Sequence, residues 1–482
     1  MAESLQKKTF SGIVWGFLQK FLLQIFAFAQ GIVLARLLSP SDYGLIAMTA
    51  IFFGISYTLI DSGFSLALVR KNHRADIDYS TVYVTNMVLS FFFGLVLFLC
   101  APLIGDFYKQ PLLTNIVRVN AVYMFMLSLI AVQNVRLTIQ LRFKVQSIIS
   151  VVSTIITGIC SMVLACCGFG VWSLIYPNFL NIVILGLLYW HYQHWFPGFK
   201  FSWASWREFF SFGSRILATN MLETIYGNIT PLVVGKAFSP KQLGYYTKAN
   251  DYAKLPAATI TNVLGHVTFP ILSEIQDDDE RLAQAYRRLI RVTAFIIFPA
   301  MIGLAALARP FIIAIITEKW APSIIFLFIL CFGNMWSPIS ALNLNLLQIK
   351  GRPDLFFRLQ VIQKVLGLLF LLASVRFGLV FLSCGVVFTA FFNVVLNTYY
   401  TGKFIHVGYL MQMRDMLPSL LYSLSMGVVV VGATCFIPSM LMQLVVGIPL
   451  GIVFYVGVSK LFKSPELDYV VRLLRTNVFH RK

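Results

Sequence analysis

The sequence predicts an all-α polytopic membrane protein with about fourteen transmembrane helices, arranged as two related six-helix bundles and two further helices. Three observations predict this fold. First, 58% of the 482 residues are hydrophobic and 12% are charged, with a mean hydropathy of +0.80, whereas soluble chains carry roughly a quarter charged residues. Second, apolar runs of about 20 residues, enough to cross a bilayer, recur along the chain. Third, a turn signal early in the chain occurs again in its second half.

The first half contains six predicted spans. The run from 11 to 38 follows Lys7 and Lys8, and we interpret it as a retained first span because Gln19 and Lys20 interrupt any signal-peptide core. The other five are predicted at 44–69, 80–105, 115–135, 148–168 and 170–190. An aromatic segment with proline and glycine follows, and we place the boundary between the halves there because Trp and Tyr concentrate at the membrane–water interface.

The second half repeats this organisation. Its six spans are predicted at 209–237, 244–272, 292–316, 323–347, 359–376 and 378–400, with a solvated helix at 277–291. Two more spans, at 416–436 and 438–462, precede a basic tail. The predicted parts are an N-terminal six-helix lobe (1–190), a cytoplasmic interlobe linker (191–208), a C-terminal six-helix lobe (209–400), and two extra helices with the basic tail (401–482).

The repeated turn relates the two lobes. Ser39-Pro40 and Gly44 are followed 200 positions later by Ser239-Pro240 and Gly244, and in both places one apolar run ends and another begins. Six spans separate the two turns, and an even number gives both copies the same orientation. The sequence therefore predicts a parallel pseudo-two-fold repeat about an axis along the membrane normal.

The formal charge of +19 follows the positive-inside rule. With the N-terminus inside, the predicted cytoplasmic segments carry roughly three times as many Lys and Arg as the outer loops. This asymmetry places both termini in the cytoplasm and requires no nucleic-acid partner. The seven cysteines all lie in apolar runs without a CxxC or Cys/His pattern, so no metal site, disulfide or cofactor is expected.

Five segments resemble the Wzx-type polysaccharide flippases of the multidrug/oligosaccharidyl-lipid/polysaccharide exporter superfamily. They are Ala35–Pro40 with Tyr43-Gly44, Asp61–Phe64 before Ala67–Val69, Phe269-Pro270 with Leu272-Ser273 and Gln276-Asp277, Glu318–Pro322, and Gly351–Leu355. The resemblance covers about residues 30–360. It implies a rocking, two-lobed transporter of MATE-like fold in the bacterial inner membrane, which moves undecaprenyl-pyrophosphate-linked oligosaccharide outward. A polysaccharide polymerase and a chain-length regulator are the partners it implies, beside membrane lipid.

Ionisable residues inside the predicted spans are the candidate site. Each central Lys or Arg costs about 2.5–3.5 kcal/mol to insert, so most should face a wet cleft, one another or the interface. The predicted substrate-binding residues are Lys20, Arg215, Lys248, Lys254 and Lys364, and the predicted ion-coupling or charge-pairing residues are Asp61, Glu223 and Asp251.

Their chemistry suits a lipid diphosphate. Lys248, Asp251 and Lys254 form a stripe on one helix face in which one acid cannot neutralise two lysines. Lys supplies a compact counter-charge to phosphate, and Arg binds it bidentately. Amide side chains are available for the sugars: Gln24, Gln30, Asn86, Asn120, Gln133 and Asn134. The acids either couple transport to protons or sodium or orient the lysines, and the sequence leaves both open.

Three alternatives are weighed against this hypothesis. A multidrug antiporter of the same superfamily commonly uses an acid in its first span, but residues 11–38 contain no Asp or Glu. A lipid II flippase has a similar fold and an equally cationic cavity, and the five motifs favour the polysaccharide branch over it. A membrane polymerase or O-antigen ligase typically has a large periplasmic loop, which is not predicted here. Walker A, HExxH and GxSxG motifs are missing, so we expect a transporter that is not an enzyme.

Overall fold

The structure is a computed structural model that describes residues 2–61, 63–193 and 195–479, with side chains described from residue 19 to 472 except at 62, 194, 266 and 267. Ser62, within the second of the five motifs, lies outside the described residues. The described chain is helical throughout, without a strand. Its contacts divide it into two compact units, Met1–Gly244 and Tyr245–Lys482. The four-part division by predicted lobes, linker and tail remains a prediction.

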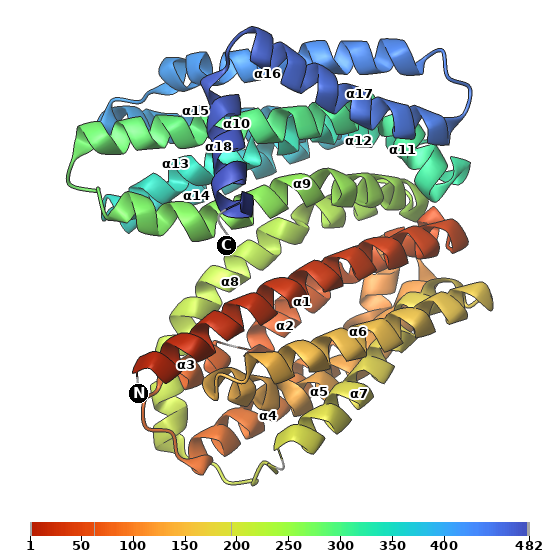
Figure 1. The fold of residues 1–482 in the computed structure, drawn as a ribbon. Helices are drawn as coiled ribbons and strands as arrows, with labels where there is room; N and C mark the ends of the chain where they lie inside the picture. The colour runs from red at the N-terminus through yellow and green to blue at the C-terminus, as the bar shows by residue number, and fades with distance from the viewer. Residues whose placement is uncertain (1, 62, 194, 480–482) are drawn as a thin grey trace. The chain divides into compact units, whose positions relative to one another are not determined.

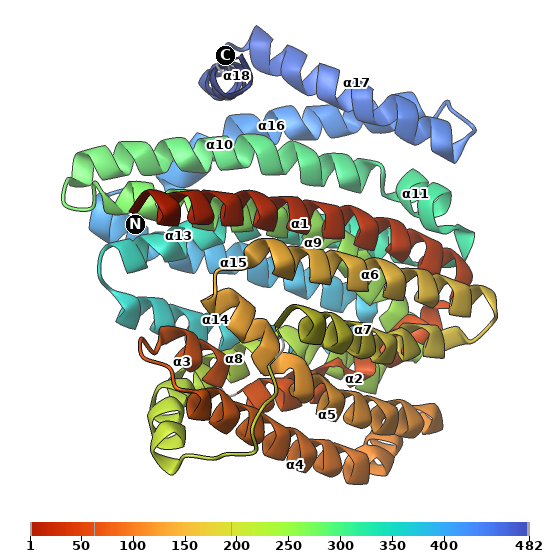
Figure 2. The ribbon, with the colours of Figure 1, turned by 60° about the horizontal axis from the view of Figure 1, so that its bottom comes forward.

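The first unit contains eight α-helices and the start of a ninth. They are α1 (Ala2–Leu37), α2 (Pro40–Asp61), α3 (Phe64–Arg70), α4 (Asp76–Tyr108), α5 (Pro111–Ile139), α6 (Phe143–Cys166), α7 (Tyr176–Gln193), α8 (Trp203–Ala237) and the first residues of α9 (Pro240–Ser273). Three pairs pack most extensively: α4 with α5, α1 with α6, and α2 with α8. Figures 1 and 2 show α1 beside α6 and α4 beside α5.

The repeated Ser-Pro turns form the same helix cap twice. α2 begins at Pro40, where the Ser39 N–H donates to Asp42 Oδ2 at 2.9 Å and the Asp42 N–H donates to Ser39 Oγ at 3.3 Å. α9 begins at Pro240, where the Ser239 N–H donates to Gln242 Oε1 at 3.2 Å. Such reciprocal bonds satisfy backbone donors that a helix start leaves free, and proline suits the first helical position.

The second unit contains the rest of α9 and nine further α-helices. They are α10 (Asp279–Ala306), α11 (Ala308–Phe311), α12 (Ser323–Asn334), α13 (Ser337–Ile349), α14 (Pro353–Ser374), α15 (Leu379–Ile405), α16 (Tyr409–Thr434), α17 (Met440–Leu461) and α18 (Pro465–Phe479). α10 packs along α16, and α16 along α17 (Figure 2). The buried Tyr455 hydroxyl donates to the Phe295 carbonyl at 2.9 Å and fixes α17 to α10.

A buried amide network joins α13, α15 and α16 in the second unit. Asn343 and Gln412 exchange two side-chain hydrogen bonds, of 3.1 and 3.0 Å, and the Thr401 hydroxyl donates to Asn343 Oδ1 at 2.7 Å. All three side chains are at most 1% exposed. Because their polar groups are paired with one another, these helices can pack closely without leaving unsatisfied amides.

Thirteen helices of the described chain are long and apolar enough to cross a membrane. The prediction of an all-α, multi-pass membrane protein is therefore confirmed. The predicted seventh span, α8, is 35 residues long but does not meet this apolar criterion. Glu223 and several amides and hydroxyls lie in its middle, which lowers its hydropathy.

Three predicted elements differ from the structure. The predicted span 44–69 is interrupted, because α2 ends at Asp61 and α3 begins only at Phe64. The helix predicted at 277–291 is not separate from the following span: α10 runs without a break from Asp279 into that span and ends at Ala306. The basic tail contains a helix, α18, whose Glu466 pairs with Arg291 of α10 at 3.6 Å.

Candidate functional site

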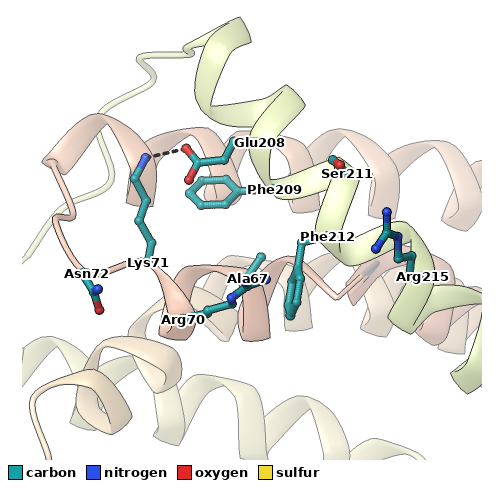
Figure 3. Close-up of a pocket in the computed structure, with 9 residues that line it drawn as sticks. All are labelled: Ala67, Arg70, Lys71, Asn72, Glu208, Phe209, Ser211, Phe212 and Arg215. Atoms are coloured by element: carbon teal, nitrogen blue, oxygen red, sulfur yellow. Dashed lines mark hydrogen bonds and ion pairs between the residues drawn. The ribbon is translucent and has the colours of Figure 1, made fainter. Parts of the chain in front are cut away.

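A pocket of about 440 Å³ in the first unit collects three cationic side chains (Figure 3). It lies where α3 and the following turn meet the first half of α8. We call it the Arg215 pocket, and its lining residues are Ala67, Arg70, Lys71, Asn72, Glu208, Phe209, Ser211, Phe212 and Arg215. Of the predicted site residues, this pocket contains Arg215.

Two glycines let α3 approach α8 closely. Gly63 has a φ of +72°, which disfavours any residue with a side chain. A Cβ at Gly63 would lie 2.9 Å from the Gly213 carbonyl oxygen and 3.0 Å from the Gly213 Cα. This backbone contact places Phe209 and Phe212, which precede Gly213 on α8, against α3.

Arg74 fixes the end of α3 that faces the pocket. Its Nε donates to the Leu68 carbonyl at 2.8 Å, and its guanidinium also donates to the Val69 carbonyl. These carbonyls belong to the last turn of α3, where helix acceptors lack intrahelical partners. The contact holds the Arg70–Lys71 segment in place.

Aromatic rings of α8 support two of the cations. The Arg70 guanidinium lies 4.5 Å from the centre of the Phe212 ring, and Lys71 Nζ lies 5.2 Å from that of Phe209. In the view of Figure 3, Phe212 lies between Arg70 and Arg215. Cation–π contacts of this kind orient a charged group without neutralising it.

Lys71 differs from the two arginines because it is paired with acids. Its Nζ lies 3.0 Å from Asp78 Oδ1 and 3.0 Å from Glu208 Oε2. Burial lowers the pKa of Lys71, but the hydrogen bonds to Glu208 and Asp78 outweigh this and raise the pKa above its ordinary value. Lys71 therefore stays charged at neutral pH, and its ion pairs link the end of α3 to α4 and α8.

Arg70 and Arg215 retain uncompensated positive charge. Within the described residues, no carboxylate oxygen lies within 4.0 Å of either guanidinium. Two unpaired guanidiniums beside apolar rings have the chemistry to attract an anion, because each presents a planar set of donors that can hold phosphate bidentately.

A second pocket, of about 320 Å³, contains the predicted residue Asp61. We call it the Asp61 pocket. Five helices of the first unit line it with Tyr57, Ile60, Asp61, Ser65, Asn86, Met124, Leu127, Ser128, Ile130, Ala131, Asn134, Val135, Leu185 and Tyr189. Two of the amides predicted for sugar contact, Asn86 and Asn134, are thus brought together with Asp61.

The charged stripe of α9 lies in the second unit. Lys248 is 7% exposed, and its Nζ lies 5.4 Å from the centre of the Tyr252 ring. Asp251 is within electrostatic range of both Lys248 and Lys254, and Asp251 and Lys254 are both exposed. The two lysines and the acid therefore form one local charge cluster, as the spacing predicts.

The remaining predicted residues line neither pocket. Lys20 is exposed near the middle of α1, and Glu223 is exposed on α8. Lys364 is half-buried on α14, in the second unit. No group of His, Cys, Asp and Glu in the described chain is arranged to hold a metal ion.

Of the residues that line the Arg215 pocket, sequence reasoning found only Arg215, and it missed the two other cations and the two aromatic rings. Arg70 and Lys71 follow a predicted span, where the positive-inside rule already accounts for basic residues. Phe209 and Phe212 have the pattern of ordinary apolar residues of a span. One feature of the sequence points to these two cations: Arg70 and Lys71 directly follow the motif segments at Asp61–Phe64 and Ala67–Val69.

Comparison with known proteins identifies a family. The family model described as polysaccharide biosynthesis protein matches residues 33–325. The teichuronic acid biosynthesis protein TuaB of Bacillus subtilis is 24% identical over 357 residues, covering 73% of this chain and 74% of TuaB. The lipopolysaccharide biosynthesis protein WzxC of Escherichia coli is 25% identical over 365 residues, covering 75% and 74%. The succinoglycan biosynthesis transport protein ExoT of Rhizobium meliloti is 24% identical and covers 67% of this chain and 65% of ExoT.

Solved structures identify the fold. The lipid II flippase MurJ in an inward closed conformation superposes with a TM-score of 0.75 at 15% identity, covering 93% of this chain and 98% of MurJ. An inward-facing MATE transporter of the MOP superfamily gives a TM-score of 0.60 at 16% identity, covering 80% and 95%. The MATE-like fold and the resemblance to Wzx-type polysaccharide proteins are confirmed.

Proposed function

Because the chain belongs to the polysaccharide biosynthesis protein family, we propose that it is a flippase for undecaprenyl-pyrophosphate-linked oligosaccharide, with the Arg215 pocket as a binding site for the diphosphate. The observation that carries this proposal is the pair of uncompensated guanidiniums, Arg70 and Arg215, facing one pocket of a membrane-spanning unit. An unpaired cation in a low-dielectric environment is costly, and a bound anion offsets that cost.

The position of the pocket supports entry from the cytoplasm. Arg70 ends α3 and Lys71 begins the following turn, on the side that the positive-inside rule assigns to the cytoplasm, where the lipid-linked precursor is made. The pocket mouth is then at the level of the headgroups, and a diphosphate can reach it while its lipid tail stays in the bilayer.

The charge of the pocket separates this function from drug export. Three cations and one acid, Glu208, line it, so a cationic drug would be repelled and an anion attracted. A lipid II flippase needs the same chemistry, since its substrate also carries a diphosphate. The relatives named for teichuronic acid, lipopolysaccharide and succinoglycan biosynthesis support a polysaccharide precursor instead.

Transport is proposed to occur by alternating access rather than by catalysis. Two parallel bundles rock about a central site and expose it to one side of the inner membrane at a time, with both termini cytoplasmic. Substrate shifts the population of states to the extent that its affinity for them differs. Lys20, Lys248, Lys254 and Lys364 are proposed to receive the diphosphate later in the cycle, with Glu223 and Asp251 as their charge partners. A polymerase and a chain-length regulator would use the exported repeat units.

Complementation of a deletion strain tests the pocket. Arg70→Gln and Arg215→Gln should each reduce surface polysaccharide and cause lipid-linked precursor to accumulate, and the double variant should abolish export. Arg215→Lys should restore export in part, because lysine keeps the charge and loses the bidentate geometry. The matched control is Arg207→Gln, an exposed arginine on the same helix that does not line the pocket. Full complementation by the double variant, at normal abundance in the membrane, would refute the proposal.

A further inference from the structure

Asp61 lies at an interruption of a membrane-spanning segment. α2 ends at Asp61 and α3 begins at Phe64, and the two helices together make one candidate span, Pro40–Arg70. The Ser65 hydroxyl, in the first turn of α3, donates to Asp61 Oδ1 at 2.7 Å. The carboxylate therefore links the two helices, at the carboxyl end of α2, where the helix dipole adds partial negative charge.

The Asp61 carboxylate has no cationic partner in the described chain. No Lys, Arg or His nitrogen lies within 4.0 Å of it, and no basic residue lines its pocket. The basic residues on neighbouring elements are directed elsewhere: Arg136 of α5 stacks on Trp195 at 4.5 Å, and Arg70 of α3 stacks on Phe212. Of the two roles predicted for this acid, pairing with a lysine is thus not favoured by its surroundings.

Asn86 supplies an independent sign that the pocket receives a ligand. Its side chain lines the Asp61 pocket and is 1% exposed, and its Oδ1 has no hydrogen-bond partner among the residues that the structure describes. Leaving a buried amide oxygen unpaired destabilises the folded chain. A hydrogen-bond donor or a cation bound to this oxygen would remove that destabilisation.

We propose that the Asp61 pocket binds a sodium ion. Alkali cations take oxygen ligands, and the pocket offers the Asp61 carboxylate with neutral oxygens from Ser65 and Asn86. A single carboxylate balances a monovalent ion. A proton would need only one acceptor, whereas several neutral oxygens are what a dehydrated cation requires. Broken helices in transporters provide coupling-ion sites of this type.

α3 connects this ion site to the Arg215 pocket. Ser65 reaches the Asp61 pocket, while Ala67 and Arg70, on the same seven-residue helix, line the Arg215 pocket. Sodium bound by both Asp61 and the Ser65 oxygen would replace their direct hydrogen bond with two oxygen–sodium contacts and so alter how α3 is held. This coupling step rests on the proposed function, whereas sodium binding does not.

The test is sodium binding to the purified full-length protein, without transport. In detergent at constant ionic strength, with choline replacing sodium, ²²Na⁺ binding should saturate at about one ion per chain, and sodium should raise the melting temperature. Asp61→Asn should abolish both responses. Ser65→Ala and Asn86→Ala should each weaken apparent affinity at least about threefold. Asp106→Asn, at an exposed carboxylate on α4 that does not line the pocket, is the matched control and should bind normally.

Two results would overturn the sodium site. One is that monodisperse wild-type protein shows no saturable sodium binding. A melting temperature that responds to pH but not to sodium would be the same result. The other is unchanged sodium binding in Asp61→Asn. If sodium does not bind while Arg70 and Arg215 remain essential for export, this inference fails and the proposed function stands.

Discussion

Gly44 and Pro240 are in direct backbone contact, and the contact is reciprocal across the sequence repeat. A Cβ added at Gly44 would lie 1.8 Å from the Pro240 carbonyl oxygen, and one added at Gly244 would lie 1.8 Å from that of Pro40. The first turns of α2 and α9 thus contact each other at the two glycines and at the prolines with which the helices begin. No side chain fits at either glycine without moving the helix ends apart.

Gly44→Ala or Gly244→Ala should therefore separate these turns. A disulfide between Ser41→Cys and Gln242→Cys, in a cysteine-free background, should form readily with both glycines present and much less with either alanine. The control is Gly227→Ala on α8, where nothing lies within 4 Å of an added Cβ. Equal crosslinking in all three variants would show that the contact does not persist in the membrane.

The same crosslink tests the rocking mechanism. If export requires these two helix ends to part and rejoin, locking Ser41→Cys to Gln242→Cys should stop export, and reduction should restore it. Unimpaired export with a demonstrably complete crosslink would exclude rocking about this contact.

The sequence was most informative where one physical rule determines the outcome. Hydropathy predicted most of the spans, and the Ser39-Pro40 and Ser239-Pro240 signals marked the boundaries between α1 and α2 and between α8 and α9. The helices begin at the prolines, before the predicted starts at Gly44 and Gly244, because each cap is formed by residues only three positions apart. It failed at the interruption after Asp61. A run with no proline reads as continuous, and the break depends on Gly63 meeting Gly213, which is 150 residues away.

The site was only partly predictable for the same reason. Arg215 and Asp61 stood out because charge inside a span is costly. Arg70 did not, because the positive-inside rule already accounts for a basic residue at the end of a span, and its pocket is completed by Phe212 of α8. The length of α10 was also misjudged: charged residues marked 277–291 as solvated, but helical periodicity carries no signal for where a helix leaves the membrane.

Lys71 should remain charged throughout the range in which export is measured. Its pKa is raised, so its ion pairs stabilise the folded chain below the ordinary lysine pKa, and this stabilisation is lost only as the pH rises through the shifted value. The difference in melting temperature between wild type and Lys71→Met should be constant from about pH 7 to about pH 9. A difference that shrinks within this range would contradict the paired lysine.

The amide network of the second unit should be strongly coupled. Asn343→Leu should destabilise the protein by about 1–3 kcal/mol, because it leaves Gln412 and Thr401 without buried partners. Combining it with Gln412→Leu should cost less than the sum of the single changes. Thermal unfolding of the four proteins of this cycle measures the coupling, and strict additivity would argue against the network.

The topology follows from the positive-inside rule and can be tested independently. Reporter fusions after His191 and after Glu280 should report a cytoplasmic location, and a fusion at Lys241 a periplasmic one. A periplasmic signal after Glu280 would be incompatible with the parallel repeat.

The central claim is that Arg70 and Arg215 bind a diphosphate, and the dissociation constant of the purified protein for undecaprenyl diphosphate tests it most directly. Each guanidinium contact to a charged group contributes about 1.5–3 kcal/mol, so Arg70→Gln and Arg215→Gln should each weaken binding at least about tenfold. Undecaprenyl monophosphate should bind the wild type more weakly and lose less in the variants, and Arg207→Gln should bind both lipids normally. Equal affinity of the wild type and the Arg70→Gln/Arg215→Gln double variant for undecaprenyl diphosphate would contradict the account.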